Sequence, residues 1–543
     1  MSEQKNSNLV RNASVLMIAS IISRVIGLLY RRPLGEILGS VGLGYYGFAS
    51  NLYSILLLIS SYSIPMATSK IISEKLAQKR YKSAEKIFKA SMLYAVVVGG
   101  VTALFCWFFG SFLLPATQQN ALPALRALAP TIFLSAILGV LRGYFQAHRT
   151  MTPTSISQIL EQIMNAAVSI LAAWLLIRAM APGGGHNAAV YGAMGGTIGT
   201  GAGVLVGLLF MGFVYYVNRN YFRKRVARDK APDKETYQDI VKMLVIMITP
   251  IIFTSFIYNC SAYLDSYLYA AIQGWHGIKD TLVTASYGEY SNYYVPLVGI
   301  PLALASASTS AMMPEVSGKY AINRIDEANE QVNQTLRLSM FICIPAMVGL
   351  TVLAYPIMGV LFPSASTLAA RLLLTGSVFV VTDSFSIITG GVLQAIGKQN
   401  TALINAGISL LVNLVSLAAM LVALPGLDIY AVMLSNIVFS VVCCVLNIYS
   451  MHKYLGTRHE IRKTYVEPLI ASVFMGAGAW IIYYLLFLLT RRPFIGLLVA
   501  VIVAMFIYLV LYVIISKITE DELRRFPMGS KLVRLLKMIR IFK

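Results

Sequence analysis

Long apolar runs alternate with short polar segments along most of the chain. Each run has about 20 or more residues, which is enough to cross the ~30 Å hydrocarbon layer of a bilayer as a helix. The runs lack the period-two alternation of barrel strands, and only helices or closed barrels satisfy every backbone group in lipid. We therefore predict an all-α polytopic membrane protein with about fourteen transmembrane helices, at 12–35, 45–67, 90–114, 123–147, 154–178, 189–217, 240–272, 284–312, 337–361, 369–396, 402–424, 429–451, 466–489 and 495–516.

Composition and charge sharpen this prediction. Hydrophobic residues make up 57% of the chain and charged residues 12%, whereas soluble domains carry roughly 25% charged residues. The net charge of +21 suggests nucleic acid at first, but most of the 44 Lys and Arg residues lie in the polar segments 70–89, 219–242, 453–463 and 517–543. This distribution follows the positive-inside rule, so it predicts a membrane protein with both termini cytoplasmic and no nucleic-acid partner.

Cysteine and glycine patterns give no sign of a cofactor. All five cysteines lie in apolar runs, without the spacing of a metal site, so we expect small buried side chains and no metal. The glycine-rich run 192–203 lacks the Lys-Ser/Thr pair of a phosphate-binding loop and predicts close helix packing. We expect no enzyme cofactor and no nucleotide-binding domain.

The chain contains an internal repeat with an offset of roughly 248 residues. The segment GYFQAHRTMTPTSISQILEQIMN (143–165) aligns with GVLQAIGKQNTALINAGISLLVN (391–413), matching Gln146 with Gln394 and Asn165 with Asn413. An even number of helices per repeat makes the two halves parallel, as in transporters that work by alternating access. The predicted organisation is a six-helix lobe (1–218), a basic cytoplasmic linker (219–238), a second six-helix lobe (239–452), helices 13 and 14 (453–516) and an amphipathic basic tail (517–543).

Three motifs resemble one known family. They are SRVIGLLYRRPLG (23–35), IPMATSKIISEKLA (64–77) and RGYFQAHRTMTPTSISQILEQ (142–162). They are similar to the MurJ-like flippases, in particular the YtgP and SpoVB branch, within the multidrug/oligosaccharidyl-lipid/polysaccharide exporter (MOP) superfamily. The resemblance covers essentially the whole chain and its count of six, six and two helices.

The resemblance implies a transporter, not an enzyme, that moves lipid II or a similar lipid-linked glycan across the membrane. It also implies a location in the bacterial cytoplasmic membrane, with that substrate, membrane lipids and cell-wall synthesis proteins as the expected partners. Flipping of another polyprenyl-linked oligosaccharide remains an alternative, and a multidrug/cation antiporter is a third. Energy would come from Na+ or H+ coupling, the membrane potential or removal of the substrate outside.

Arginines in the first span are the candidates for substrate binding. Arg24, Arg31 and Arg32 lie in or near a span, where charged groups are costly and therefore functional candidates. Arg24 and Arg31 are seven residues apart, on one helix face, and guanidinium groups hold pyrophosphate by paired hydrogen bonds. Proteobacterial family members carry a further span-1 arginine where this chain has Tyr30. The alternative is that Arg31 and Arg32 extend to the outer head groups.

Two further groups of polar residues lie inside spans. Asp265 matches an acidic position that family members use in a cation site, and Asn405, Ser409 and Asn413 follow one helix face and could complete it. Hydrogen bonding between helices is the alternative for the latter three. Arg142 and Glu161 are predicted to form an ion pair, either structural or part of a cytoplasmic gate.

Overall fold

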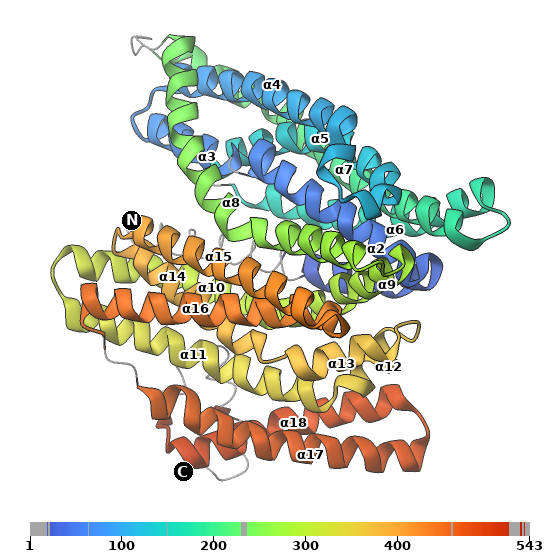
Figure 1. Cartoon of the computed structure of the whole chain (residues 1–543). Coiled ribbons are helices and arrows are strands. Elements are labelled where there is room, and N and C mark those ends of the chain that lie inside the picture. The colour runs from blue at the N-terminus through green and yellow to red at the C-terminus, as the bar shows by residue number, and fades with distance from the viewer. Residues whose placement is uncertain are drawn as a thin grey trace. The chain divides into compact units, whose positions relative to one another are not determined.

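The computed structural model describes residues 19, 22–62, 64–148, 150–229, 236–457, 460–520, 533–534 and 537. All elements formed by these residues are helices, as predicted (Figure 1). The chain divides into two compact units: unit 1 is Met1–Asn292 with Leu421–Ile429, and unit 2 is Tyr293–Met420 with Tyr430–Lys543.

In unit 1 the described helical residues 19 and 22–29 come before eight α-helices. These are α2 (Arg31–Leu57), α3 (Ile64–Ala77), α4 (Tyr81–Leu113), α5 (Leu122–Ala147), α6 (Thr152–Met180), α7 (Gly185–Ala227), α8 (Tyr237–Trp275) and α9 (Asp280–Glu289), with short η1 (Leu58–Tyr62) and η2 (Ala116–Ala121) between them.

Unit 2 takes most of the remaining helices, after η3 (Tyr290–Tyr294). These are α10 (Val295–Ala321), α11 (Ile325–Val352), α12 (Ala354–Leu361), α13 (Thr367–Gly376), α14 (Phe379–Ala395), α15 (Gln399–Ala423), α16 (Ile429–Leu455), η5 (Arg462–Val466), α17 (Glu467–Thr490) and α18 (Pro493–Ser516). The end of α15 and the short η4 (Pro425–Leu427) belong to unit 1.

The described helices account for most of the predicted spans. Eleven are long and apolar enough to cross a membrane, or twelve if the bent pair α13–α14 is one span. The predicted span 12–35 includes residues that the structure does not describe. Helix α8 occupies the predicted span 240–272, and only some of its side chains are described. The other predicted spans, from 45–67 to 495–516, all fall on described helices.

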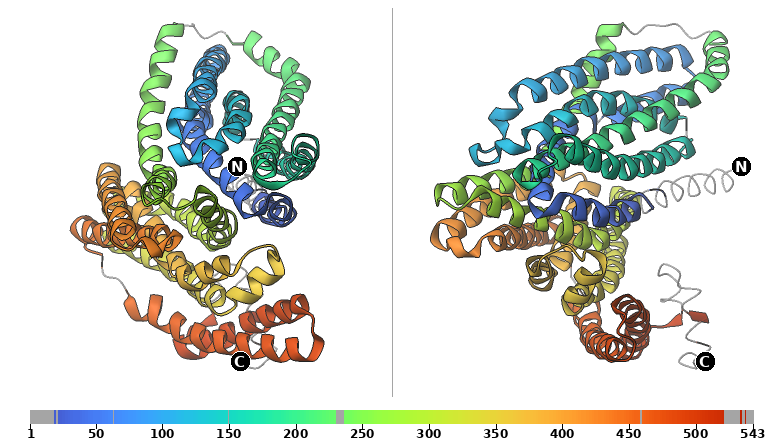
Figure 2. Two further views of the ribbon diagram at one scale, coloured as in Figure 1. Left: turned by 45° about the vertical axis from the view of Figure 1, so that its right-hand side comes forward. Right: turned by 90° about the vertical axis from the view of Figure 1, so that its right-hand side faces the viewer.

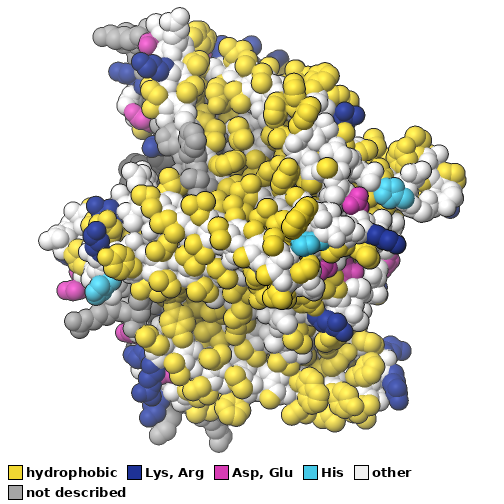
Figure 3. All heavy atoms as spheres, viewed as in Figure 1, with side chains coloured by type: hydrophobic (Ala, Val, Ile, Leu, Met, Phe, Trp, Pro, Cys, Tyr) yellow, Lys and Arg dark blue, Asp and Glu magenta, His cyan; other side chains and the backbone are white. Residues whose placement is uncertain are grey.

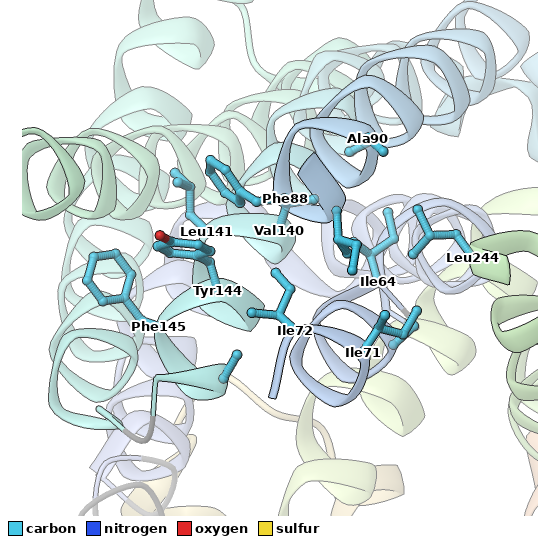
Figure 4. Packing of buried hydrophobic residues seen from close by; sticks show 14 of the residues in the cluster. Ile64, Ile71, Ile72, Phe88, Ala90, Val140, Leu141, Tyr144, Phe145 and Leu244 are labelled. Carbon is cyan, nitrogen blue, oxygen red and sulfur yellow. The ribbon is translucent and has the colours of Figure 1, made fainter. Parts of the chain in front are cut away.

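One hydrophobic core of unit 1 lies where α3, α4, α5 and α8 meet. Ile64 and Ile72 of α3 face Phe88 of α4, Val140 of α5 and Leu244 of α8 (Figure 4). Gly143 allows α5 to approach α3, because a Cβ there would lie 2.7 Å from the carbonyl oxygen of Pro65. The start of α8 is fixed by a capping box, in which the Thr236 hydroxyl donates to Asp239 over 2.6 Å and lowers the pKa of that carboxyl.

The two copies of the internal repeat have matching hydrogen bonds at two turns. At the end of α5 the amides of His148 and Thr150 donate to the carbonyls of Tyr144 and Phe145, and at the end of α14 the amides of Ile396 and Lys398 donate to Val392 and Leu393. Each donor and acceptor at the end of α5 thus corresponds to a donor or acceptor at the end of α14, at an offset of roughly 248 residues. The α3–α4 and α10–α11 turns also match, since Lys79 and Asn323 both have φ of 59°.

Helix breaks occur within two predicted spans. Gly39, with φ of 65° and ψ of 173°, bends α2 and separates the end of the first predicted span from the second. Between α13 and α14 the axis turns by 51°. The freed carbonyl of Gly376 accepts a 2.9 Å hydrogen bond from the Tyr294 hydroxyl, which satisfies a backbone group that would otherwise be costly in an apolar surrounding.

Helices α17 and α18 form an antiparallel pair that packs on α11 in unit 2 (Figure 2). The Tyr508 hydroxyl donates to the Phe341 carbonyl over 2.8 Å, and Arg337 Nε donates to the Tyr512 hydroxyl over 3.4 Å. The outer surface of the pair is hydrophobic, with Lys and Arg side chains gathered at both ends (Figure 3). This pattern fits two membrane-spanning helices with charged ends in the head-group layers.

The compact units do not divide at the predicted linker. Residues 219–227 continue α7, residues 230–235 lie outside the described part, and α8 belongs to unit 1. The repeat and the compact units are therefore different partitions of one chain. The two-lobe boundaries stay a prediction from the repeat, and most of the predicted tail 517–543 also lies outside the described residues.

Candidate functional site

The three candidate substrate arginines have different surroundings, all within unit 1. Arg24 is exposed and makes no hydrogen bond or ion pair with the part of the chain that the structure describes. Arg31 donates from Nη1 to the carbonyls of Ser291 and Asn292 over 3.4 and 3.1 Å. Arg32 pairs with Glu36 over 3.5 Å on an exposed face. Of the three arginines, only Arg24 has no polar contact with the described residues, and its binding role stays a prediction.

Arg31 belongs to a tightly packed contact between α2 and α9 that the sequence did not reveal. A Cβ on Gly288 would lie 2.3 Å from the Ser40 carbonyl oxygen, so only glycine permits this approach. The Ser40 hydroxyl donates to the buried Glu289 over 3.0 Å, and Asn292 donates to the Leu43 carbonyl over 2.9 Å. Glu289 is an acidic residue within an apolar run, and this was the available signal in the sequence.

The predicted pair of Arg142 and Glu161 is formed. Arg142 Nη2 lies 2.7 Å from Glu161 Oε2, and its Nε donates to the Ser157 hydroxyl over 2.9 Å. The two side chains are 16% and 29% exposed, so solvent screens the pair only in part. Gly207 of α7 lies beside the pair, since a Cβ there would be in ordinary van der Waals contact, 3.7 Å from Arg142 Nη2. The role of the pair as a gate stays a prediction.

Asp265 is a buried carboxylate in α8, 2% exposed. It acts electrostatically on Tyr287 of α9, whose hydroxyl accepts a hydrogen bond from Asn51 of α2. A buried carboxylate among amide and hydroxyl groups is chemically suited to a hard cation, because such ions prefer oxygen ligands. Asp265 thus remains the acidic candidate for cation coupling.

The other three candidate cation ligands lie on α15 in unit 2, and all are buried. Asn405 Nδ2 donates to Asn447 Oδ1 and to the Ser450 hydroxyl of α16, over 2.9 and 3.0 Å, and Asn447 donates onward to Thr389 of α14 over 3.1 Å. The Ser409 hydroxyl donates to the Asn405 carbonyl over 2.7 Å. Asn405 therefore takes part in hydrogen bonding between helices, the alternative that the sequence left open.

Asn413 lies two turns further along α15. Asn413, Asn405 and Ser409 belong to unit 2, whereas Asp265 belongs to unit 1. A common cation site built from all four residues therefore stays a prediction. Asp383 of α14, another acidic residue in an apolar run, makes no hydrogen bond or ion pair with the described residues.

An aromatic cluster closes one end of unit 1, at the repeat motif. The His148 ring packs on Tyr144 and Phe222 at 4.5 and 4.9 Å between centroids, and its Nδ1 lies 2.9 Å from the Tyr144 carbonyl oxygen. Burial lowers the pKa of His148, and the nearby positive charge of Arg225 acts in the same direction. The imidazole is therefore held in its neutral form, with Nδ1 donating.

The chain matches known families of membrane transporters. Residues 9–318 match the family described as Polysaccharide biosynthesis protein, and residues 250–419 match the MatE family. The lipid II flippase MurJ of Bacillus subtilis is 26% identical over 89% of both chains. Stage V sporulation protein B of the same species is 24% identical over 96% of this chain and 98% of that one.

Solved structures show the same fold. A structure titled lipid II flippase MurJ, inward closed conformation, has a TM-score of 0.67 and 15% identity, and the match covers 92% of this chain and 98% of that one. An inward-facing multidrug resistance MATE family transporter of the MOP superfamily has a TM-score of 0.63 and 16% identity, over 82% and 98%. The chain therefore belongs to the polysaccharide biosynthesis protein family, as a non-enzymatic, multi-pass, MurJ-like flippase of the MOP superfamily.

Proposed function

We propose that this chain moves lipid II from the cytoplasmic to the outer leaflet by alternating access. The relative that carries lipid II in its name supports this substrate, and the sporulation relative, which matches to a similar degree, keeps another polyprenyl-linked glycan as the second candidate. The single observation that supports a lipid-linked substrate is an apolar groove in unit 2. The groove also argues against the multidrug antiporter, which has no need to hold a long lipid chain.

The groove lies where α17 and α18 meet α10 and α11, with a cavity volume of about 640 Å³. Its lining is almost entirely hydrophobic, including Pro301, Phe341, Leu350, Met475 and Met505. Such a surface fits an isoprenoid chain, which gains about 0.8 kcal/mol for each CH₂ that it buries. The tail would rest there while the charged head group crosses by a polar route.

Head-group binding is assigned to unit 1. Arg24 supplies a guanidinium group that is free of other described contacts, and a pyrophosphate is held best by paired, charge-assisted hydrogen bonds. Arg31 and Arg32 are second candidates, because each would have to give up a present contact. We also propose that transport is coupled to Na+ or H+ through Asp265. Both termini would lie in the cytoplasm, and the chain would contact cell-wall synthesis proteins.

The groove can be tested by filling it. Gly349 of α11 lines the groove, and a Cβ there meets no atom within 4 Å, so Gly349→Phe adds a side chain without a backbone clash. We expect it to reduce rescue of a strain depleted of its lipid II flippase, at normal membrane abundance. The matched control is Gly407→Phe on α15, also in unit 2, equally open and outside the groove. Equal rescue by both variants would remove the groove from the mechanism.

Purified protein in liposomes separates the candidate substrates. We expect lipid II to reach the outer leaflet faster than an undecaprenyl-linked oligosaccharide without the peptide. The reverse order would assign the chain to polysaccharide precursors. Efflux of a cationic drug without movement of either lipid would favour the antiporter.

A further inference from the structure

The connection between α15 and α16 has an unusual place in the molecule. Helices α15 and α16 lie mainly in unit 2, but residues Leu421–Ile429 belong to unit 1. The chain thus enters unit 1 for one short loop and then returns. Asp428, the last residue before α16, carries the side-chain contacts of this loop.

Asp428 accepts hydrogen bonds from three side chains of unit 1. The donors are the Tyr269 hydroxyl and Gln273 Nε2 of α8, both to Oδ1, and the Ser286 hydroxyl of α9, to Oδ2. The Gln273 and Ser286 distances are 3.2 and 2.8 Å. Both carboxylate oxygens are used, and Tyr269 and Gln273 are fully buried. A charged acceptor with three donors is a specific fastening between the loop and the two helices.

Two features oppose this fastening. Asp428 has φ of 45° and ψ of −132°, a conformation that only glycine adopts without strain. The Oε1 atom of the buried Gln273 has no hydrogen-bond partner among the described residues, and an unsatisfied buried oxygen is costly. The contact therefore combines strong hydrogen bonds with opposing strain, as expected of a contact that must form and release.

The fastening is linked to α2 through aromatic rings. Tyr269 lies 6.2 Å from Tyr287 between ring centroids, and Tyr287 stacks on Phe48 of α2 at 4.3 Å. Asn51 of α2 donates to the Tyr287 hydroxyl. Movement of the loop would therefore shift Tyr269 and Tyr287, and with them the packed contact between α2 and α9.

We propose that Asp428 is a releasable latch, which holds the α15–α16 connection on α8 and α9 in this state and lets go when the transporter changes state. By the predicted topology, the loops at 276–279 and 424–428 lie on the outer side, so release of the latch loosens the outer ends of α8 and α9. The latch rests on the proposed alternating-access transport. It does not depend on the identity of the substrate.

Locking the latch should stop transport. In Ser286→Cys/Asp428→Cys one sulfur takes the place of the Ser286 hydroxyl oxygen and the other that of the Asp428 carboxyl carbon. The hydroxyl lies 2.8 Å from an oxygen of that carboxyl, so the two sulfurs are close enough for an oxidant to join them. We expect oxidation to reduce transport at least tenfold and a reductant to restore it, with the joined peptides confirmed by mass spectrometry. Each single cysteine variant and the parent chain, treated with the same oxidant, are the controls. A joined protein that transports at the normal rate would overturn the proposal.

Removing the latch should loosen the outer ends of α8 and α9 without any substrate. Thr284 of α9 is fully buried, so a cysteine placed there reports opening through its reaction with an impermeant thiol reagent. Asp428→Gly removes the side chain and relieves the backbone strain. We expect it to raise labelling of Thr284→Cys roughly tenfold, because it removes three hydrogen bonds.

The labelling experiment has a matched control and is independent of the substrate. Tyr263→Phe in α8 removes one tyrosine hydrogen bond, to the Leu113 carbonyl, away from the latch, and should leave labelling unchanged. Unchanged labelling in Asp428→Gly would overturn the latch. Increased labelling in a chain that does not move lipid II would keep the latch and refute the substrate assignment.

Discussion

The two copies of the internal repeat use the same positions for different chemistry. At an offset of roughly 248 residues, Arg142, Ser157 and Glu161 of unit 1 correspond to Gly390, Asn405 and Ser409 of unit 2. The first copy contains an ion pair, and the second contains neutral hydrogen bonds from α15 to α16 and along α15. Removing one member of a partly buried ion pair leaves the other charge unpaired. This lowers the stability of the fold more than the loss of a neutral hydrogen bond in the same setting. At these three positions, the charged residues belong to one copy only.

The largest effect is expected from breaking the ion pair. Arg142→Ala leaves Glu161 partly buried without its partner, which should cost about 3 kcal/mol of stability. Glu161→Ser, which places in unit 1 the residue that unit 2 has at this position, should recover most of that loss in the double variant. Thermal unfolding of the detergent-solubilised protein measures both. Additive losses would show that the two charges do not interact.

Arg24 should give the next largest effect, on substrate binding. Loss of a charged hydrogen bond costs about 1.5–3 kcal/mol, so Arg24→Ala should weaken lipid binding roughly ten- to a hundredfold. Arg24→Lys should restore only part of it, because an ammonium group lacks the planar paired geometry. Binding of lipid II to purified protein measures this, with Arg126→Ala as the control in the same unit. A fully active Arg24→Ala protein would move the head-group site elsewhere.

The neutral copy should respond more weakly. Asn405→Leu removes two hydrogen bonds to α16, and side-chain hydrogen bonds between membrane helices average about 0.6 kcal/mol each. We expect a loss of about 1 kcal/mol in thermal unfolding, clearly below that of Arg142→Ala. The ion dependence of transport, measured alongside, separates the two roles that the sequence allowed. Loss of Na+ or H+ dependence in this variant, as in Asp265→Asn, would assign Asn405 to the cation site.

Sequence predicted well those features that depend on local pattern. Apolar runs located the helices, because a span must be continuous and long. The Arg142–Glu161 pair could be predicted because one short turn joins two neighbouring spans, and charged groups in such spans need partners.

Contacts between distant segments escaped prediction. The packing of α2 on α9 depends on Ser40 and Gly288, about 250 residues apart, and nothing in either local sequence identifies the other. Asp428 looked like an ordinary loop residue, since its three donors come from helices more than 140 positions away. The bend between α13 and α14 contains no proline, and it is supported by a hydroxyl from Tyr294.

The smallest expected effect concerns pH and the aromatic cluster at the end of α5, for which unit 2 has the aliphatic Ile396 in place of His148. Burial lowers the pKa of His148 in the folded protein below its ordinary value of 6.5. As the pH falls below 6.5, the unfolded chain binds a proton that the folded chain does not, so stability is lost between that value and the lower folded pKa.

His148→Gln keeps a donor for the Tyr144 carbonyl but cannot take up a proton. The melting temperature should therefore fall more between pH 7 and pH 5 in the parent chain than in His148→Gln, while the carboxylates that both chains share contribute equally. Identical pH profiles would show that the folded chain accommodates the imidazolium, with Arg225 moving away.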